Sequence, residues 1–300
     1  MINYKERAEK LVSFLDEIYD VINEVGNSHH GQNKAEIDIV KTTYLSIAEK
    51  VARNIHGITS LLKNEDGHLE NNRHPMMLLF RGIVEDLWVG AYLIRLKEDK
   101  VSFQNEIHVI ALQFTRASEF LIKREPYFGF AGKEFKDLGK QEIESLIEKK
   151  LNDFRNANEH LYKQGDNGEK ILKSPGELRS TSNPDHLKLR VKNGDESDWN
   201  NKPYSVALLN EIIEFVGNDE AVLLQLYSYT YLLYRVLSQY QHFSLDVSLE
   251  ILNKEVEYEM ALIVKSVGLI YMLLTKQLQE LGLSDAQFGR LEKAFNHYSE

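Results

Sequence analysis

The feature of this sequence that most constrains its fold is the recurrence of apolar residues at spacings of three and four along most of its length. This spacing places apolar side chains on one stripe of an α-helix. Residues 3–25 illustrate the pattern with Leu11, Phe14, Leu15, Ile18 and Ile22. The alternation that a half-buried strand would need does not run through the chain. The sequence therefore predicts an all-α protein, a multi-helix bundle of about nine helices.

The predicted helices cover residues 3–25, 34–63, 75–98, 102–125, 140–163, 204–216, 219–242, 246–281 and 284–298. Gly26 is expected to end the first helix, because glycine favours the position just after a helix. Pro75 is expected in the first turn of the third helix, where its missing N–H has no cost. Ser284 and Gln287 form the pattern of a capping box at the start of the last helix.

One long stretch, residues 165–203, breaks the helical pattern because Gly, Asn, Ser, Asp and Pro dominate it and no period persists. Such a span is unusual inside a compact domain. It is a mobile lid, a disordered insert, or a packed irregular excursion with a short hairpin around residues 187–191. Since each half of the chain has a very apolar helix that needs a partner, we predict a single helical domain over residues 1–300 with this insert within it.

Composition limits the location and the partners. The chain has no cysteine, which excludes disulfides, thiolate metal sites and a thiol nucleophile. The N-terminal stretch contains acidic residues and no apolar core, so we do not expect a signal peptide. The apolar stretch from Met260 to Leu274 is broken by Lys265 and is too short to span a bilayer. We therefore expect a cytoplasmic protein without a membrane partner.

The net charge of −10 argues against binding of nucleic acid by bulk electrostatics, because phosphate binding needs a positive footprint. Only a local basic patch could serve. The sequence also lacks HExxH, paired ExxH segments, a Walker loop and GxGxxG. We therefore predict no metal and no cofactor.

Three groups of residues could carry chemistry. In the first, Arg81 and Glu85 lie one helical turn apart in an apolar helix, so they can pair. They are either a structural ion pair or half of a buried polar site. In the second, Arg235, Ser238 and His242 share one stripe of a helix. They are either a satisfied polar network in the core or part of a site, and no nucleophile elbow surrounds Ser238.

The third group is Arg155, Asn156 and His160, which suits phosphodiester chemistry without a metal. An imidazole can move a proton near neutral pH, and a guanidinium can stabilise charge on a phosphate. The alternative is a solvated helix surface. In a continuous helix the side chains of Arg155 and His160 diverge by about 140°, so joint action requires the helix to start or distort there.

Two resemblances follow from these residues. The FRxxxE segment at residues 80–85, with the later YxxxSxxxHxS segment at 234–244, resembles an uncharacterised bacterial helical family. That resemblance covers about residues 70–250 and implies an all-α fold in which the polar residues meet. It implies no activity.

Arg155, Asn156 and His160 also resemble the Arg-polar-x-x-x-His signature of HEPN domains. These are helical bundles, many of them metal-independent ribonucleases of toxin–antitoxin, anti-phage and CRISPR systems. The resemblance implies that His160 is the general acid/base, that Arg155 stabilises the phosphorane-like state and that the site forms in a homodimer. Arg235 and His242 fit a looser version of the same signature.

Two functions of different classes are therefore predicted side by side. One is a HEPN-like ribonuclease of a bacterial defence or stress system, with RNA as its partner. The other is a non-catalytic helical scaffold that binds a partner protein. A third hypothesis is an enzyme whose pocket combines Arg81 and Glu85 with Ser238 and His242.

Overall fold

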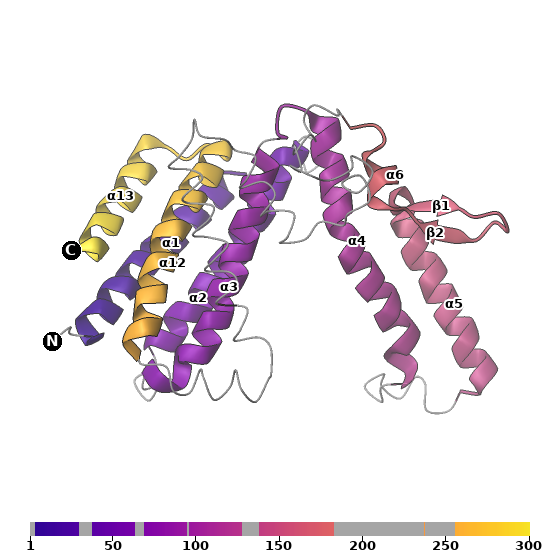
Figure 1. The fold of residues 1–300 in the computed structure, drawn as a ribbon, viewed down its shortest axis with the longest axis horizontal. Coiled ribbons are helices and arrows are strands. Elements are labelled where there is room, and N and C mark those ends of the chain that lie inside the picture. The colour runs from indigo at the N-terminus through magenta and orange to yellow at the C-terminus, as the bar shows by residue number, and fades with distance from the viewer. Residues whose placement is uncertain are drawn as a thin grey trace, which may run out of the picture. The chain divides into compact units, whose positions relative to one another are not determined.

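The computed structural model describes residues 4–29, 38–63, 69–94, 96–127, 138–182, 237 and 256–300. Within these residues the chain forms eight α-helices, two 3-10 helices and one two-stranded sheet (Figure 1). The prediction of an all-α fold is therefore confirmed. The helices predicted over 204–216 and 219–242 lie outside the described residues, except that Leu237 is helical and buried.

The chain folds into two compact units. The first unit comprises Met1–Glu98 and Ile212–Glu300, and the second comprises Asp99–Glu211. The predicted insert at 165–203 belongs to the second unit. That all 300 residues form a single domain stays a prediction.

The first unit is a helical bundle with one apolar core. Its described helices are α1 (Tyr4–His29), α2 (Ile39–Lys63), α3 (Leu69–Ile94), α12 (Val256–Glu280) and α13 (Asp285–Ser299). α1 packs against α2 and α13, and α3 packs against α2 and α12 (Figure 1). Each helix contributes buried side chains to this core, among them Phe14, Ile55, Phe80, Leu278 and Leu291. Burial of each such side chain contributes about 1.5–3 kcal/mol, so the apolar stripes hold the bundle together.

The apolar stretch from Met260 to Leu274 lies in α12. Two of its residues, Ile270 and Leu274, belong to the core. Across the described part of the chain, no helix combines the length and the apolar character needed to cross a membrane.

α1 runs through Gly26 to His29, so the predicted end of this helix is wrong. Contacts beyond the local sequence explain the extension. The imidazole Nε2 of His29 donates a 2.9 Å hydrogen bond to the carbonyl of Leu281, between α12 and α13. This contact offsets the cost of glycine inside a helix, which is about 1 kcal/mol.

α3 begins at Leu69, so Pro75 lies inside the helix and not in its first turn as predicted. Proline removes one backbone donor at that point. The side-chain amide of Asn72 donates a 2.9 Å hydrogen bond to the carbonyl of Leu61 in α2. This bond fastens the beginning of α3 to its neighbour and supports the early start.

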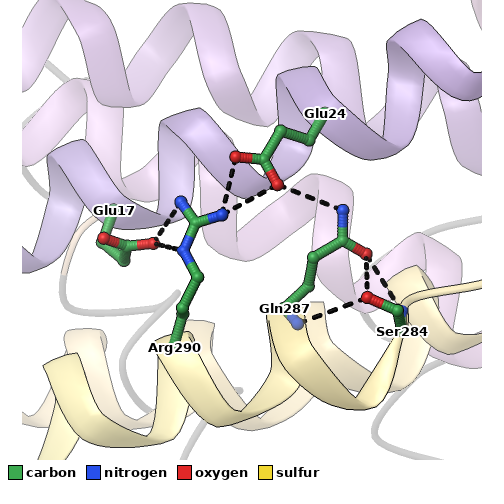
Figure 2. A network of polar contacts seen from close by, with 5 residues as sticks. All are labelled: Glu17, Glu24, Ser284, Gln287 and Arg290. Carbon is green, nitrogen blue, oxygen red and sulfur yellow. Dashed lines mark hydrogen bonds and ion pairs between the residues drawn. The ribbon is translucent and has the colours of Figure 1, made fainter.

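The capping box predicted at the start of α13 is confirmed. The hydroxyl of Ser284 accepts a hydrogen bond from the backbone of Gln287, whose side-chain oxygen accepts one from the backbone of Ser284 (Figure 2). One turn later Arg290 pairs with Glu17 and Glu24 of α1, each at 2.7 Å (Figure 2). The hydrogen bond from Arg290 lowers the pKa of Glu24. Because such exposed pairs contribute about 0–1 kcal/mol, they orient α13 more than they anchor it.

α2, α3 and α12 approach one another closely at Gly90. The side-chain amide of buried Gln277, on α12, donates a 2.6 Å hydrogen bond to the carbonyl of Leu87 on α3. The hydroxyl of Tyr44, on α2, donates to the carbonyl of Gly90 at 3.1 Å. A Cβ atom at position 90 would lie 2.3–2.5 Å from the amide atoms of Gln277. Glycine is therefore the residue that allows this approach.

We expect Gly90→Ala to lower the free energy of unfolding by about 1–3 kcal/mol, because the added methyl group overlaps a buried amide. Gly26→Ala is the matched control, since its Cβ would meet nothing within 4 Å. That change should raise the free energy of unfolding by about 0.5–1 kcal/mol. Urea denaturation measures both values, and similar effects in the two variants would contradict the close packing at Gly90.

The second unit is built on two long helices, α4 (Lys100–Arg124) and α5 (Lys140–Ala157). The 3-10 turns η1 (Glu125–Tyr127) and η3 (Glu159–Leu161), the strands β1 (Tyr162–Gln164) and β2 (Lys170–Leu172) and the short helix α6 (Pro175–Arg179) complete its described part. α4 packs against both α5 and α6. Asp99 caps α4, because its carboxylate accepts hydrogen bonds from the backbone of Val101 and Ser102, each at 3.1 Å.

α5 ends at Ala157, six residues before the predicted end at position 163. Asn158 leaves the helical conformation with φ −118° and ψ 32°, and its side-chain amide donates to the carbonyl of Phe154 at 2.8 Å. The chain then makes the turn η3. The helix therefore stops between Arg155 and His160, which is the kind of break that the third group of residues requires.

The chain next forms an antiparallel hairpin in which Tyr162 faces Leu172. Gly168 in its turn has φ +79°, a conformation that favours glycine. Beyond the strands, the backbone N–H of Lys173 donates to the carbonyl of Leu161 at 2.9 Å, so the pairing continues by one residue. The hairpin proposed around residues 187–191 lies outside the described residues.

Candidate functional site

Arg155 lies in the last turn of α5 and contacts α4. Its Nε donates a 2.6 Å hydrogen bond to Glu119, and the Tyr162 hydroxyl donates to the same carboxylate oxygen at 3.1 Å. Burial acts to raise the pKa of Glu119, but the hydrogen bond and the charge of Arg155 hold it below its usual value. Burial, followed by the nearby carboxylate, raises the pKa of Tyr162 to about 12, so its hydroxyl remains a donor at neutral pH.

Asn156 is exposed and contacts the hairpin. Its side-chain oxygen accepts a 2.6 Å hydrogen bond from the Lys170 ammonium on β2. The hairpin thus folds back beside the end of α5. This contact places the Lys170 ammonium next to Asn156, the polar residue that follows Arg155 in the HEPN-like pattern.

His160 lies in η3, is exposed, and packs against His108 of α4. The centroids of the two imidazole rings are 4.5 Å apart, and the ring planes meet at 44°. The ammonium of Lys173 donates a 2.8 Å hydrogen bond to the backbone carbonyl of His160. Burial, then the charges of His160 and Lys173, lower the pKa of His108, which favours its neutral form at pH 7. Two imidazoles and an ammonium group therefore meet at one edge of α4.

In the structure, the side chains of Arg155 and His160 contact different residues. Arg155 contacts Glu119 and Tyr162, whereas the imidazole of His160 contacts His108. Glu119 and His108 lie about three turns apart along α4. Chemically, one part of the site can hold an anion through a guanidinium, and the other can exchange protons.

A buried ion pair fixes the segment after the hairpin on α4. The guanidinium of Arg179, on α6, donates to both carboxylate oxygens of Glu106. Its Nη2 donates to one oxygen at 3.0 Å, and its Nε donates to the other. The two side chains are 1% and 0% exposed. Nearby, the side-chain amide of Asn105 donates to the hydroxyl of Ser182 at 2.8 Å. These contacts hold α6 on α4 and thereby position the strand that leads to Lys173.

We expect Arg179→Ala to lower the free energy of unfolding of the second unit by about 3–5 kcal/mol, because it leaves the Glu106 carboxylate buried without this guanidinium. Lys163→Ala is the control, since it removes an exposed ion pair with Glu177 and should cost at most about 1 kcal/mol. Urea denaturation followed by hydrogen exchange on α4 measures both. A loss below about 1 kcal/mol in Arg179→Ala would show that the pair does not hold this segment.

The other predicted polar groups are described only in part. Arg81 and Glu85 form an ion pair on α3 at 3.5 Å, with side chains 18% and 41% exposed. The two side chains therefore pair as their one-turn spacing allows, and their part in a polar site stays a prediction. Arg235, Ser238 and His242 lie outside the described residues, so their part in a site stays a prediction.

The charge of the chain is unevenly distributed. Asp99–Glu211 contain 18 Lys and Arg against 19 Asp and Glu, although the whole chain has a net charge of −10. Nearly all of the acidic excess therefore lies in the first unit. Among the described residues, no three His, Cys, Asp or Glu side chains group closely enough to hold a metal ion.

Sequence reasoning missed His108, Lys173 and the buried ion pair. One signal was present for Glu106, because it lies on the stripe between Phe103 and Val109, both buried. A charge on such a stripe needs a buried partner. No comparable signal marked His108, which is separated from His160 by 52 positions.

Comparisons of the chain with protein-family models, with curated proteins and with solved structures find no match.

Proposed function

We propose that the second unit is a metal-independent ribonuclease of the HEPN-like kind, acting in a bacterial defence or stress system. The observation that carries this proposal is the exposed imidazole of His160 at the break after α5, with a second imidazole and the Lys173 ammonium beside it. An imidazole can transfer protons near neutral pH. Fixed cations can stabilise the charge that grows on a phosphate during cleavage.

Arg155 is able to contact a phosphate while it remains bonded to Glu119. The bond to Glu119 uses the Nε–H, one of the five N–H donors of the guanidinium. The carboxylate fixes the orientation of the side chain, and the remaining donors can face an anion. In this proposal Arg155 binds the RNA backbone, and Asn156 positions Lys170 beside it.

The distribution of charge weakens the sequence-based objection to RNA. Binding to phosphates depends on cations near the contact and not on the net charge of the whole chain. The near balance of charge in Asp99–Glu211, with Lys173 bonded to His160 and Lys170 bonded to Asn156, supports a local positive footprint.

We expect His160→Ala to reduce cleavage of single-stranded RNA by about 10²–10⁴-fold, because it removes a proton-transfer group. The assay uses the purified full chain in the presence of EDTA. His297→Ala, which changes an exposed histidine on α13, is the matched control and should keep wild-type activity. A wild-type protein that cleaves no RNA, or a His160→Ala variant as active as wild type, would reject the proposal.

A second candidate function, binding of a partner protein without catalysis, rests on the exposed apolar side chains of α4. Phe114 is 80% exposed, and Phe120 and Leu121 are 55% and 59% exposed. Apolar side chains gathered on a surface often mark an interaction site. Phe114→Ser with Leu121→Ser would then abolish binding to the partner, whereas His160→Ala would not.

A further inference from the structure

His108 is a histidine of the second unit that lies outside the Arg-polar-x-x-x-His pattern of Arg155, Asn156 and His160. It lies on α4, half-buried, and its ring packs on the exposed ring of His160 with centroids 4.5 Å apart. The two residues come from elements far apart in the sequence but from the same chain and the same unit. A single chain therefore brings two imidazoles together.

The surrounding contacts hold this histidine pair in place. The backbone N–H of Lys173 donates to the carbonyl of Leu161, and the Lys173 ammonium donates to the carbonyl of His160. Lys173 therefore holds the last two residues of η3. The buried ion pair of Arg179 and Glu106 fixes the following helix on α4, two positions before His108. Such fixed geometry is what a proton-transfer pair requires, because small displacements of catalytic groups slow a reaction severely.

We infer that His108 and His160 of one chain are the two proton-transfer groups of the ribonuclease site, His108 as the base and His160 as the acid. This inference rests on the proposed function. It differs from the resemblance to HEPN domains, which implies a site shared between two copies. Here each chain carries a complete pair of imidazoles.

The reaction balances without water or metal. Neutral His108 takes the proton of a ribose 2′-hydroxyl, and the 2′-oxygen forms a bond to the adjacent phosphorus. The bond from phosphorus to the 5′-oxygen breaks, and protonated His160 gives its proton to that oxygen. The products are a 2′,3′-cyclic phosphate and a 5′-hydroxyl end. One proton leaves the 2′-oxygen and the other reaches the 5′-oxygen while both oxygens are partly bonded to one phosphorus. The two imidazoles must therefore lie close together, as they do here.

The different surroundings of the two rings support the division of roles. Burial, and then the charges of His160 and Lys173, lower the pKa of half-buried His108 and favour its neutral form. A neutral imidazole can accept a proton. His160 is exposed to solvent, from which it can regain a proton after each cycle.

The first test compares His108→Ala, His108→Gln and His160→Ala in the cleavage assay. We expect each variant to lose activity by about 10²–10⁴-fold. The Gln variant retains most of the side-chain volume and guards against a loss caused by misfolding. If His160→Ala is inactive while both His108 variants retain full activity, the inference fails and the proposed function stands. If all variants are active, both fail.

The second test mixes inactive His108→Ala and His160→Ala proteins in equal amounts. Because one chain supplies both imidazoles, we expect no recovery of activity. A site shared between two copies would instead pair an intact His108 from one variant with an intact His160 from the other. Recovery to about a quarter or more of wild-type activity in mixed dimers would therefore overturn the inference.

The third test assigns the roles. An RNA with sulfur in place of the 5′-bridging oxygen has a leaving group that needs no proton. We expect this substrate to restore much of the activity of His160→Ala and little of that of His108→Ala. The opposite result would overturn the assignment of base and acid.

Discussion

The ion pair between Arg179 and Glu106 is the interaction on which the arrangement of the second unit depends. Two buried charges are tolerated because each oxygen of the carboxylate receives a guanidinium N–H. An arrangement that separated the two groups while either stayed buried would cost several kcal/mol. The pair therefore selects one position of α6 on α4. Since α6 follows β2 closely, that choice also fixes the hairpin and the residues beside His108.

The first unit is held together differently. Its five described helices share an apolar core, and ion pairs such as Arg290 with Glu24 lie at its surface. Its most specific contact is steric, at Gly90, where the absence of a side chain lets Gln277 reach the backbone of α3. In this unit apolar burial supplies the stability, and a few polar contacts decide how the helices align.

The sequence predicts the helices well because their apolar spacing is a local property, but it places several ends incorrectly. α1 continues beyond Gly26 because the imidazole of His29 donates to the carbonyl of Leu281, between α12 and α13. α5 ends early because the side-chain amide of Asn158 donates to the carbonyl of Phe154. The first reason is a tertiary contact, which no local pattern contains. The capping box at Ser284 is predictable because both of its partners are local.

In the candidate site, too, the local pattern is visible in the sequence and the tertiary contacts are not. Arg155, Asn156 and His160 could be selected from the sequence, because their types and spacing are visible within six residues. Their partners could not, because Glu119, Lys170 and His108 reach them only through folding. The fold gives Arg155 and His160 separate surroundings on α4. The proposed function gives anion binding to Arg155 and proton transfer to His160.

Folding of the second unit brings the imidazoles of His108 and His160 into contact. The nuclear Overhauser effect between the ring protons of these two residues tests it directly in the full-length protein, with the signals assigned through the His108→Gln and His160→Ala variants. We expect a clear cross-peak between the two rings. Resolved and assigned ring signals without that cross-peak, in a folded protein, would contradict it.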